Sequence, residues 1–262
     1  MTTYFDSEEA RREGKSTEVF GKGLTNREMK RGKEYQLFIH IVDMLTEDCF
    51  NGMSHEAVVH SGAAPFVRRF GKRDYFYLKP EEEGIDGFPD FFVDRENIIC
   101  IVDHFCIDSS SRRERAGDNG TEYLSLLGRN RGNVLLAQRS EEYRRMVFSP
   151  DSLKKTVGMM MGKKSKKTRQ YESAVKTYID RRGKEIAEID NAKPMEIWLL
   201  VEDSSPEEER YSDIAIEQIK VEMDNYPNIS GVIYAYCGYQ NRLPHEISDI
   251  RFIVQDEIIK HN

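Results

Sequence analysis

Cysteine is scarce in this sequence and is not arranged in pairs. The four cysteines, Cys49, Cys100, Cys106 and Cys237, include no C-x-x-C motif. A zinc site needs several ligands at characteristic spacings, and none is visible. Cys100 and Cys106 lie in or next to an apolar run, where a free thiol behaves as a small hydrophobic side chain. We therefore expect reduced cysteines and a cytoplasmic protein.

Long apolar runs are missing as well. Residues 1–24 are polar and charged, without the apolar core of a signal peptide. The longest apolar stretches have the length of strands, so no membrane partner is predicted. Positive charge does not prevail either: the formal net charge is −7, which is atypical of a protein that binds nucleic acid through its overall charge. A local basic patch is compatible with that average.

The remaining composition indicates a globular α/β protein. The chain has 262 residues, of which 39% are hydrophobic, enough for a substantial core without disulfides. Residues 1–24 are predicted to form a flexible or weakly packed arm. Strands then alternate with helices, which predicts a central mixed sheet flanked by helices. We expect a single α/β domain over residues 25–262, with a helical insertion at about 138–190.

Two carboxylates are predicted to meet at one edge of this sheet. The strand at 98–105 is apolar on both faces, which is typical of a central strand, and Asp103 lies near its end. Asp90 begins the preceding strand, and a turn at 94–97 joins the two into a hairpin. A pair of carboxylates at such an edge suits Mg²⁺ or Mn²⁺, because hard cations prefer oxygen ligands.

A third carboxylate belongs to the helix that begins near Thr25. Glu34 precedes Phe38 by four residues and Ile41 by seven, so it shares the apolar face of that helix. If this face packs on the same sheet, Glu34 completes an acidic cluster with Asp90 and Asp103. The alternative is a helix-edge glutamate whose stem lies along the core.

These residues resemble a known family. Helix glutamate, Pro89-Asp90-Phe91, an apolar strand and then Asp103-His104-Phe105 follow the order of the PD-(D/E)XK nuclease superfamily, over roughly residues 28–108. The resemblance implies a restriction-endonuclease-like core with helical insertions. It also implies that Glu34, Asp90 and Asp103 bind Mg²⁺ or Mn²⁺ while a metal-bound water cleaves a phosphodiester bond of DNA. The closest variant places histidine after the second acid, which makes His104 a candidate catalytic residue.

The sequence departs from the family pattern at Phe105, where the superfamily places a lysine that stabilises developing charge. Strand alternation puts Phe105 on the face of Asp103 and His104 on the opposite face. Either a lysine comes from elsewhere, with Lys79 the nearest upstream, or the site is weakened to a nucleic-acid-binding relative. A basic run later in the chain either contacts the phosphates of a nucleic acid or forms a solvated loop. Its residues are Lys163, Lys164, Lys166, Lys167 and Arg169.

Structural explanations compete with each of these assignments. Asp90 after a proline is typical of a turn, Asp103 could pair with an arginine, and His104 could be a packed histidine. A second acidic pair, Glu202-Asp203, precedes Ser204-Ser205-Pro206, and we assign it to a helix start. The alternative to a nuclease is a non-enzymatic interaction protein, whose protein partner docks on the charged helix near 170–189.

Overall fold

The computed structural model describes the following residues: 37–38, 41, 63–70, 76–78, 85–113, 122–130, 133–182, 189–238 and 249–255. The predicted arm of residues 1–24, Glu34 and Lys79 lie outside these residues. Leu37, Phe38 and Ile41 are helical and buried, as their spacing predicted.

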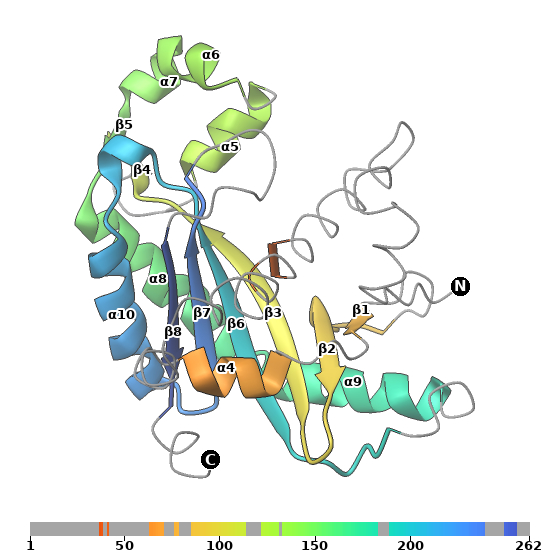
Figure 1. The fold of residues 1–262 in the computed structure, drawn as a ribbon. Coiled ribbons are helices and arrows are strands. Elements are labelled where there is room, and N and C mark those ends of the chain that lie inside the picture. The colour runs from red at the N-terminus through yellow and green to blue at the C-terminus, as the bar shows by residue number, and fades with distance from the viewer. Residues whose placement is uncertain are drawn as a thin grey trace, which may run out of the picture. The chain divides into compact units, whose positions relative to one another are not determined.

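The predicted α/β architecture is confirmed, because a mixed sheet is flanked by helices (Figure 1). The sheet order is β1 (Phe76–Leu78), β2 (Phe91–Asp94), β3 (Ile99–Ile107), β6 (Met195–Asp203), β7 (Gly231–Tyr236) and β8 (Asp249–Val254). β1, β2 and β3 pair antiparallel, as do β7 and β8. β3 and β6 run in the same direction: the Ile99 amide donates to the Pro194 carbonyl, and the Ser204 amide donates to the Ile107 carbonyl.

The chain forms two compact units, and each has a hydrophobic core of its own. The division passes through β3 after Asp103 and through β6 after Trp198. The first unit consists of residues 1–103, 167–198 and 256–262, and the second of residues 104–166 and 199–255. The restriction-endonuclease-like core and the single domain from residue 25 stay predictions.

In the first unit, aromatic rings cover one face of the β2–β3 hairpin. The Phe91 ring centroid lies 4.6 Å from that of Phe38, and the Trp198 ring lies 5.4 Å from Phe70 of α4 (Ala63–Phe70). Both pairs meet edge to face, an arrangement that aromatic rings prefer. Edge-to-face contacts between large aromatic rings therefore hold separate elements of the first unit together.

The opposite face of the hairpin is covered by α9 (Thr168–Arg182), which packs against Phe92 and Ile101. The two faces together bury β3 from both sides, as its apolar sequence predicted. The buried side chains of α9 recur at helical spacing: Tyr171, Ala174, Val175, Tyr178 and Ile179.

In the second unit, α8 (Pro150–Ser165) and α10 (Ser212–Asn225) share a core with β6 and β7. α8 begins at a favourable cap, because the Ser149 hydroxyl accepts from the Ser152 amide at 3.2 Å and Pro150 occupies the first turn. The buried apolar side chains of the two helices are Leu153, Val157, Met161, Ala215, Ile216, Ile219 and Met223.

The helical segments predicted from residue 138 are interrupted by a short strand. Ser140 ends one helix and caps the next, since its hydroxyl accepts from the Tyr143 amide at 3.0 Å. The strand that follows pairs with β4 in a separate two-stranded sheet. The elements concerned are β4 (Ser110–Arg112), α5 (Glu122–Arg129), α6 (Val134–Arg139), α7 (Glu141–Arg144) and β5 (Met146–Phe148).

Candidate functional site

Two of the predicted metal ligands lie at the open end of the β2–β3 hairpin. Phe91 pairs with Val102, and the same register continued one residue beyond β2 would set Asp90 opposite Asp103. Residues directly opposite each other in an antiparallel pair have Cβ atoms about 4.5–5.5 Å apart. Asp90 is half-buried and Asp103 is 5% exposed. By strand alternation, both residues belong to the face of the hairpin that α9 covers, the face of Phe92 and Ile101.

The approach to β2 depends on Gly87. Its φ of 73° lies in the left-handed region that favours glycine. A Cβ at this position would also stand 2.2 Å from side-chain atoms of Gln170 in α9. Gly87 therefore allows the chain to turn closely against α9 just before Pro89 and Asp90.

Tyr171 of α9 ties this pair of acids to the helix. Its hydroxyl donates a hydrogen bond to Oδ2 of Asp103. Burial, the charge of Asp103 and the hydrogen bond to it, and the charge of Asp90 together raise the pKa of Tyr171 well above its ordinary value. Because both carboxylates act on one hydroxyl, the first unit concentrates negative charge at this point. Sequence reasoning missed Tyr171, which has the spacing of an ordinary core residue.

His104 lies in the second unit, where it contacts Glu202, a residue that the sequence did not single out as a site residue. Its Nε2 is 3.0 Å from Oε2 of Glu202, and its side chain is only 3% exposed. Burial alone would raise the pKa of Glu202, but the hydrogen bond and charge of His104 hold it below its ordinary value. His104 is therefore a packed, hydrogen-bonded histidine in this arrangement.

Glu202-Asp203 were predicted to lead into a helix start, and a short 3₁₀ helix does begin at Glu207, but the two acids also make contacts of their own. Asp203 accepts from the Ser205 amide at 2.9 Å and from the buried Tyr234 hydroxyl at 2.7 Å, so it closes a turn and anchors β7. A short 3₁₀ helix, η3 (Glu207–Glu209), follows, and α10 begins only at Ser212. The two acids therefore serve buried contacts at the carboxyl end of β6.

A lysine does lie beside residue 105, and it comes from α8. The Nζ atom of Lys164 is 6.0 Å from the centroid of the Phe105 ring and donates to the His104 carbonyl at 2.9 Å. From the sequence, Lys164 was predicted only as one of the phosphate contacts of the basic run. In that run the side chains of Lys163, Lys166, Lys167 and Arg169 are exposed, whereas Lys164 is half-buried.

Asp108, the last residue of the stretch that resembles the nuclease superfamily, is fully buried. Its carboxyl group accepts from the amide and hydroxyl of Ser110 and, at 3.2 Å, from the Leu124 amide. Burial outweighs these hydrogen bonds and raises the pKa of Asp108 to about 7. The group holds β4 and α5 together rather than facing a cavity.

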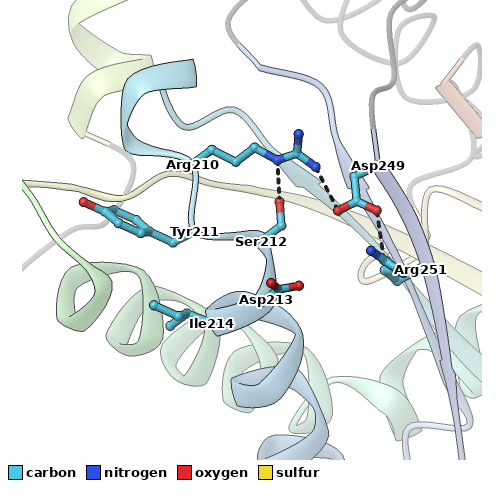
Figure 2. A pocket seen from close by; sticks show the side chains of 7 residues that line it. All are labelled: Arg210, Tyr211, Ser212, Asp213, Ile214, Asp249 and Arg251. Carbon is cyan, nitrogen blue, oxygen red and sulfur yellow. Dashed lines mark hydrogen bonds and ion pairs between the residues drawn. The ribbon is translucent and has the colours of Figure 1, made fainter.

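A pocket of about 380 Å³ lies at the start of α10 in the second unit (Figure 2). Asp249 lines this pocket and forms ion pairs with both of its arginines: its carboxylate is 2.9 Å from the Arg210 guanidinium and 2.9 Å from that of Arg251. Arg210 also donates to Ser212 at 3.1 Å. The arginines are thus already bound to a carboxylate of the chain itself.

Comparison of the chain with family models, with curated proteins and with solved structures finds no match. The resemblance to the PD-(D/E)XK superfamily therefore stays a prediction from the residues quoted above. Among the residues that the structure describes, no helix has both the length and the apolar character needed to cross a membrane.

Proposed function

We propose that this chain is a divergent metal-dependent nuclease, in which Asp90 and Asp103 bind Mg²⁺ or Mn²⁺. The observation that supports the proposal is the β2–β3 register, which pairs Phe91 with Val102 and so leads Asp90 towards Asp103, the acceptor of the Tyr171 hydroxyl. Two neighbouring carboxylates repel each other, and a cation bound by both relieves that repulsion. A cation is the partner that two neighbouring carboxylates favour most.

The chemistry follows from the donor set. Mg²⁺ and Mn²⁺ are held by one or two carboxylates and keep several waters, so a site with two aspartates leaves positions for water and for a phosphoryl oxygen. The ion polarises that oxygen and lowers the pKa of a bound water that attacks phosphorus. Glu34 is the proposed third ligand, as the family resemblance implies. His104 is not assigned a proton-transfer role, because its Nε2 faces Glu202.

The test is DNA cleavage in the presence of Mn²⁺, with supercoiled plasmid and single-stranded DNA as substrates. Asp90→Asn and Asp103→Asn should each lower the cleavage rate about 100-fold or more, since a catalytic metal is worth several kcal/mol of transition-state stabilisation. Asp94→Asn is the matched control: it lies at the other end of β2 and pairs with Lys193 at 2.8 Å. Equal cleavage by all three variants, or none by the parent protein, refutes the nuclease.

Tyr171→Phe separates a metal site from a purely structural hydrogen bond. If Asp103 binds a cation, removing the hydroxyl frees Oδ2, and the affinity for Mn²⁺ measured by calorimetry should stay equal or increase. If Asp103 serves only to hold α9, the variant unfolds more easily and no Mn²⁺ binding is detected in either protein.

A protein-interaction module is the second candidate, and one observation favours it. Leu135 and Leu136 are neighbours on α6 and are 65% and 54% exposed. Contiguous exposed apolar surface marks sites of protein interaction, and these two leucines are adjacent. The charged helix predicted to dock a partner includes α9, whose apolar side chains are buried in the first unit. No cleavage and no Mn²⁺-dependent change in melting temperature would favour this candidate.

A further inference from the structure

Three side chains with different donor atoms converge in the second unit. His104 and Cys106 are two residues apart on β3, so they project from one face, and Glu202 comes from β6. The three ligand atoms, Nε2, Sγ and Oε2, all lie within 4.8 Å of one another. This spacing is invisible in the sequence, because Glu202 is 98 residues from His104.

The triangle that these atoms form has the size of one face of a zinc tetrahedron. The Nε2–Oε2 distance is 3.0 Å, the Sγ–Nε2 distance 3.7 Å and the Sγ–Oε2 distance 3.4 Å. Usual bond lengths of zinc to histidine, cysteine and carboxylate, with tetrahedral angles, give edges of about 3.3, 3.6 and 3.5 Å. Each edge agrees within about 0.3 Å, so small side-chain adjustments would admit the ion.

We propose that His104, Cys106 and Glu202 bind a Zn²⁺ ion, with water as the fourth ligand. Imidazole, thiolate and carboxylate are the three ligand types that zinc takes in proteins, and a thiolate with a carboxylate neutralises its charge. Binding releases the proton of the Cys106 thiol, and the imidazole offers Nε2 as a lone-pair donor. Three protein ligands and one water leave a position open to an incoming group.

A cysteine–histidine–glutamate catalytic triad does not fit the same geometry. In a triad the two ring nitrogens contact different partners, the nucleophile on one side and the acid on the other. Here Cys106 and Glu202 both face Nε2 of His104.

Neighbouring groups hold two of the ligands in place, as metal sites require. The Ser204 hydroxyl donates to Oε1 of Glu202 at 3.3 Å, which turns Oε2 towards the other two ligands. Lys164 fixes the His104 backbone through its carbonyl. The Glu202 side chain is 29% exposed and that of His104 is 3% exposed, so an ion enters from the side of Glu202.

This site does not rest on the proposed nuclease. It lies in the other unit, and its nitrogen and sulfur donors select zinc, whereas the two aspartates of the first unit select a hard cation.

The experiment uses the full chain without a polyhistidine tag, stripped with a chelator and titrated with Co²⁺ as a spectroscopic substitute for Zn²⁺. We expect one equivalent of Co²⁺ to give the visible bands of a tetrahedral ion and a sulfur-to-cobalt charge-transfer band. Cys106→Ser should remove the charge-transfer band. Zn²⁺, measured by competition with a chromophoric chelator, should bind this variant more than about 100-fold more weakly, since even outer partners of zinc ligands cost 10–100-fold.

Matched controls make the result decisive. Cys237 is another thiol of the second unit, close enough for the charges of Cys106 and Glu202 to act on it but not one of the three clustered residues, so Cys237→Ser should keep both the band and the affinity. Glu202→Gln should weaken Zn²⁺ binding while Cys106 still supplies the sulfur band at higher Co²⁺ concentration. Circular dichroism verifies that each variant is folded. Absence of a sulfur band in the parent protein, or a band that survives Cys106→Ser, overturns the assignment.

Discussion

Glu196 is a carboxylate inside the first unit, and its dependence on Arg69 gives a sharp test of the packing there. Its two oxygens accept from the Arg69 guanidinium at 3.0 and 2.9 Å, and Oε2 also accepts from Trp198 Nε1 at 3.1 Å. The two charged side chains are only 15% and 10% exposed. Arg69→Met removes the charge partner but leaves the carboxylate in place.

The expected cost follows from the uncompensated charge. Removing one partner of a buried ion pair destabilises a protein by about 3–5 kcal/mol, because the remaining charge has lost its compensation. Adding Glu196→Gln removes that charge, and the amide oxygen still accepts from Trp198. The double variant should therefore recover about 1–3 kcal/mol relative to Arg69→Met, the usual coupling between residues in contact.

The assay is urea unfolding followed by tryptophan fluorescence, since Trp198 is the chain's single tryptophan and is fully buried next to the ion pair. The signal therefore reports on the first unit alone. Arg68→Met, an exposed neighbour on α4, is the matched control and should cost less than about 1 kcal/mol. If Arg69→Met and Arg68→Met lower the free energy of unfolding equally, Arg69 does not compensate a buried charge on Glu196, and the reasoning is refuted.

Three further predictions concern the second unit and are measured by circular dichroism during urea unfolding. Ser149→Ala removes the cap of α8 and should cost about 1 kcal/mol. Tyr234→Phe leaves an oxygen of buried Asp203 without its donor and should cost about 1–3 kcal/mol. The pKa of Asp108 is raised to about 7 in the folded state against about 3.9 when unfolded, so its stabilising contribution is complete below pH 4 and is lost as pH rises through 7. The free energy of unfolding relative to Asp108→Asn should fall across that range, and a flat difference contradicts the buried carboxyl.

The hairpin that carries Asp90 and Asp103 could be predicted because its signals are local. Apolar runs, a polar turn and alternation located strands at 91–93 and 98–105, and the structure has them at Phe91–Asp94 and Ile99–Ile107. The register then follows from the length of the turn, whose Arg95 amide donates to the Ile98 carbonyl at 2.9 Å. A sequence separation this short fixes which residues face each other.

The partners of those residues could not be predicted, because they come from distant parts of the chain. Tyr171 is 68 residues from Asp103 and has the spacing of a core residue on α9. Glu202 lies beside acids and serines that favour a helix start, and only its position next to β3 shows that it faces His104. The three-residue strand β5 is too short to produce a periodic pattern.

Metal preference distinguishes the two proposed sites, since their donor atoms differ. Two aspartates offer only oxygen, which suits Mg²⁺ and Mn²⁺, whereas His104, Cys106 and Glu202 offer nitrogen, sulfur and oxygen, which suits Zn²⁺ and Co²⁺. We therefore expect the double variant Asp90→Asn, Asp103→Asn to lose Mn²⁺ binding in calorimetry and to keep the sulfur-to-cobalt band. Cys106→Ser should do the reverse.

Each variant is thus the control for the other. If both ions are lost together in either variant while circular dichroism is unchanged, the ligands do not form two separate sites and both assignments are wrong. Loss of one ion alone supports the site whose donors were removed, because a general effect on folding would remove both. The result is informative even if the chain cleaves no DNA, since metal binding is measured directly.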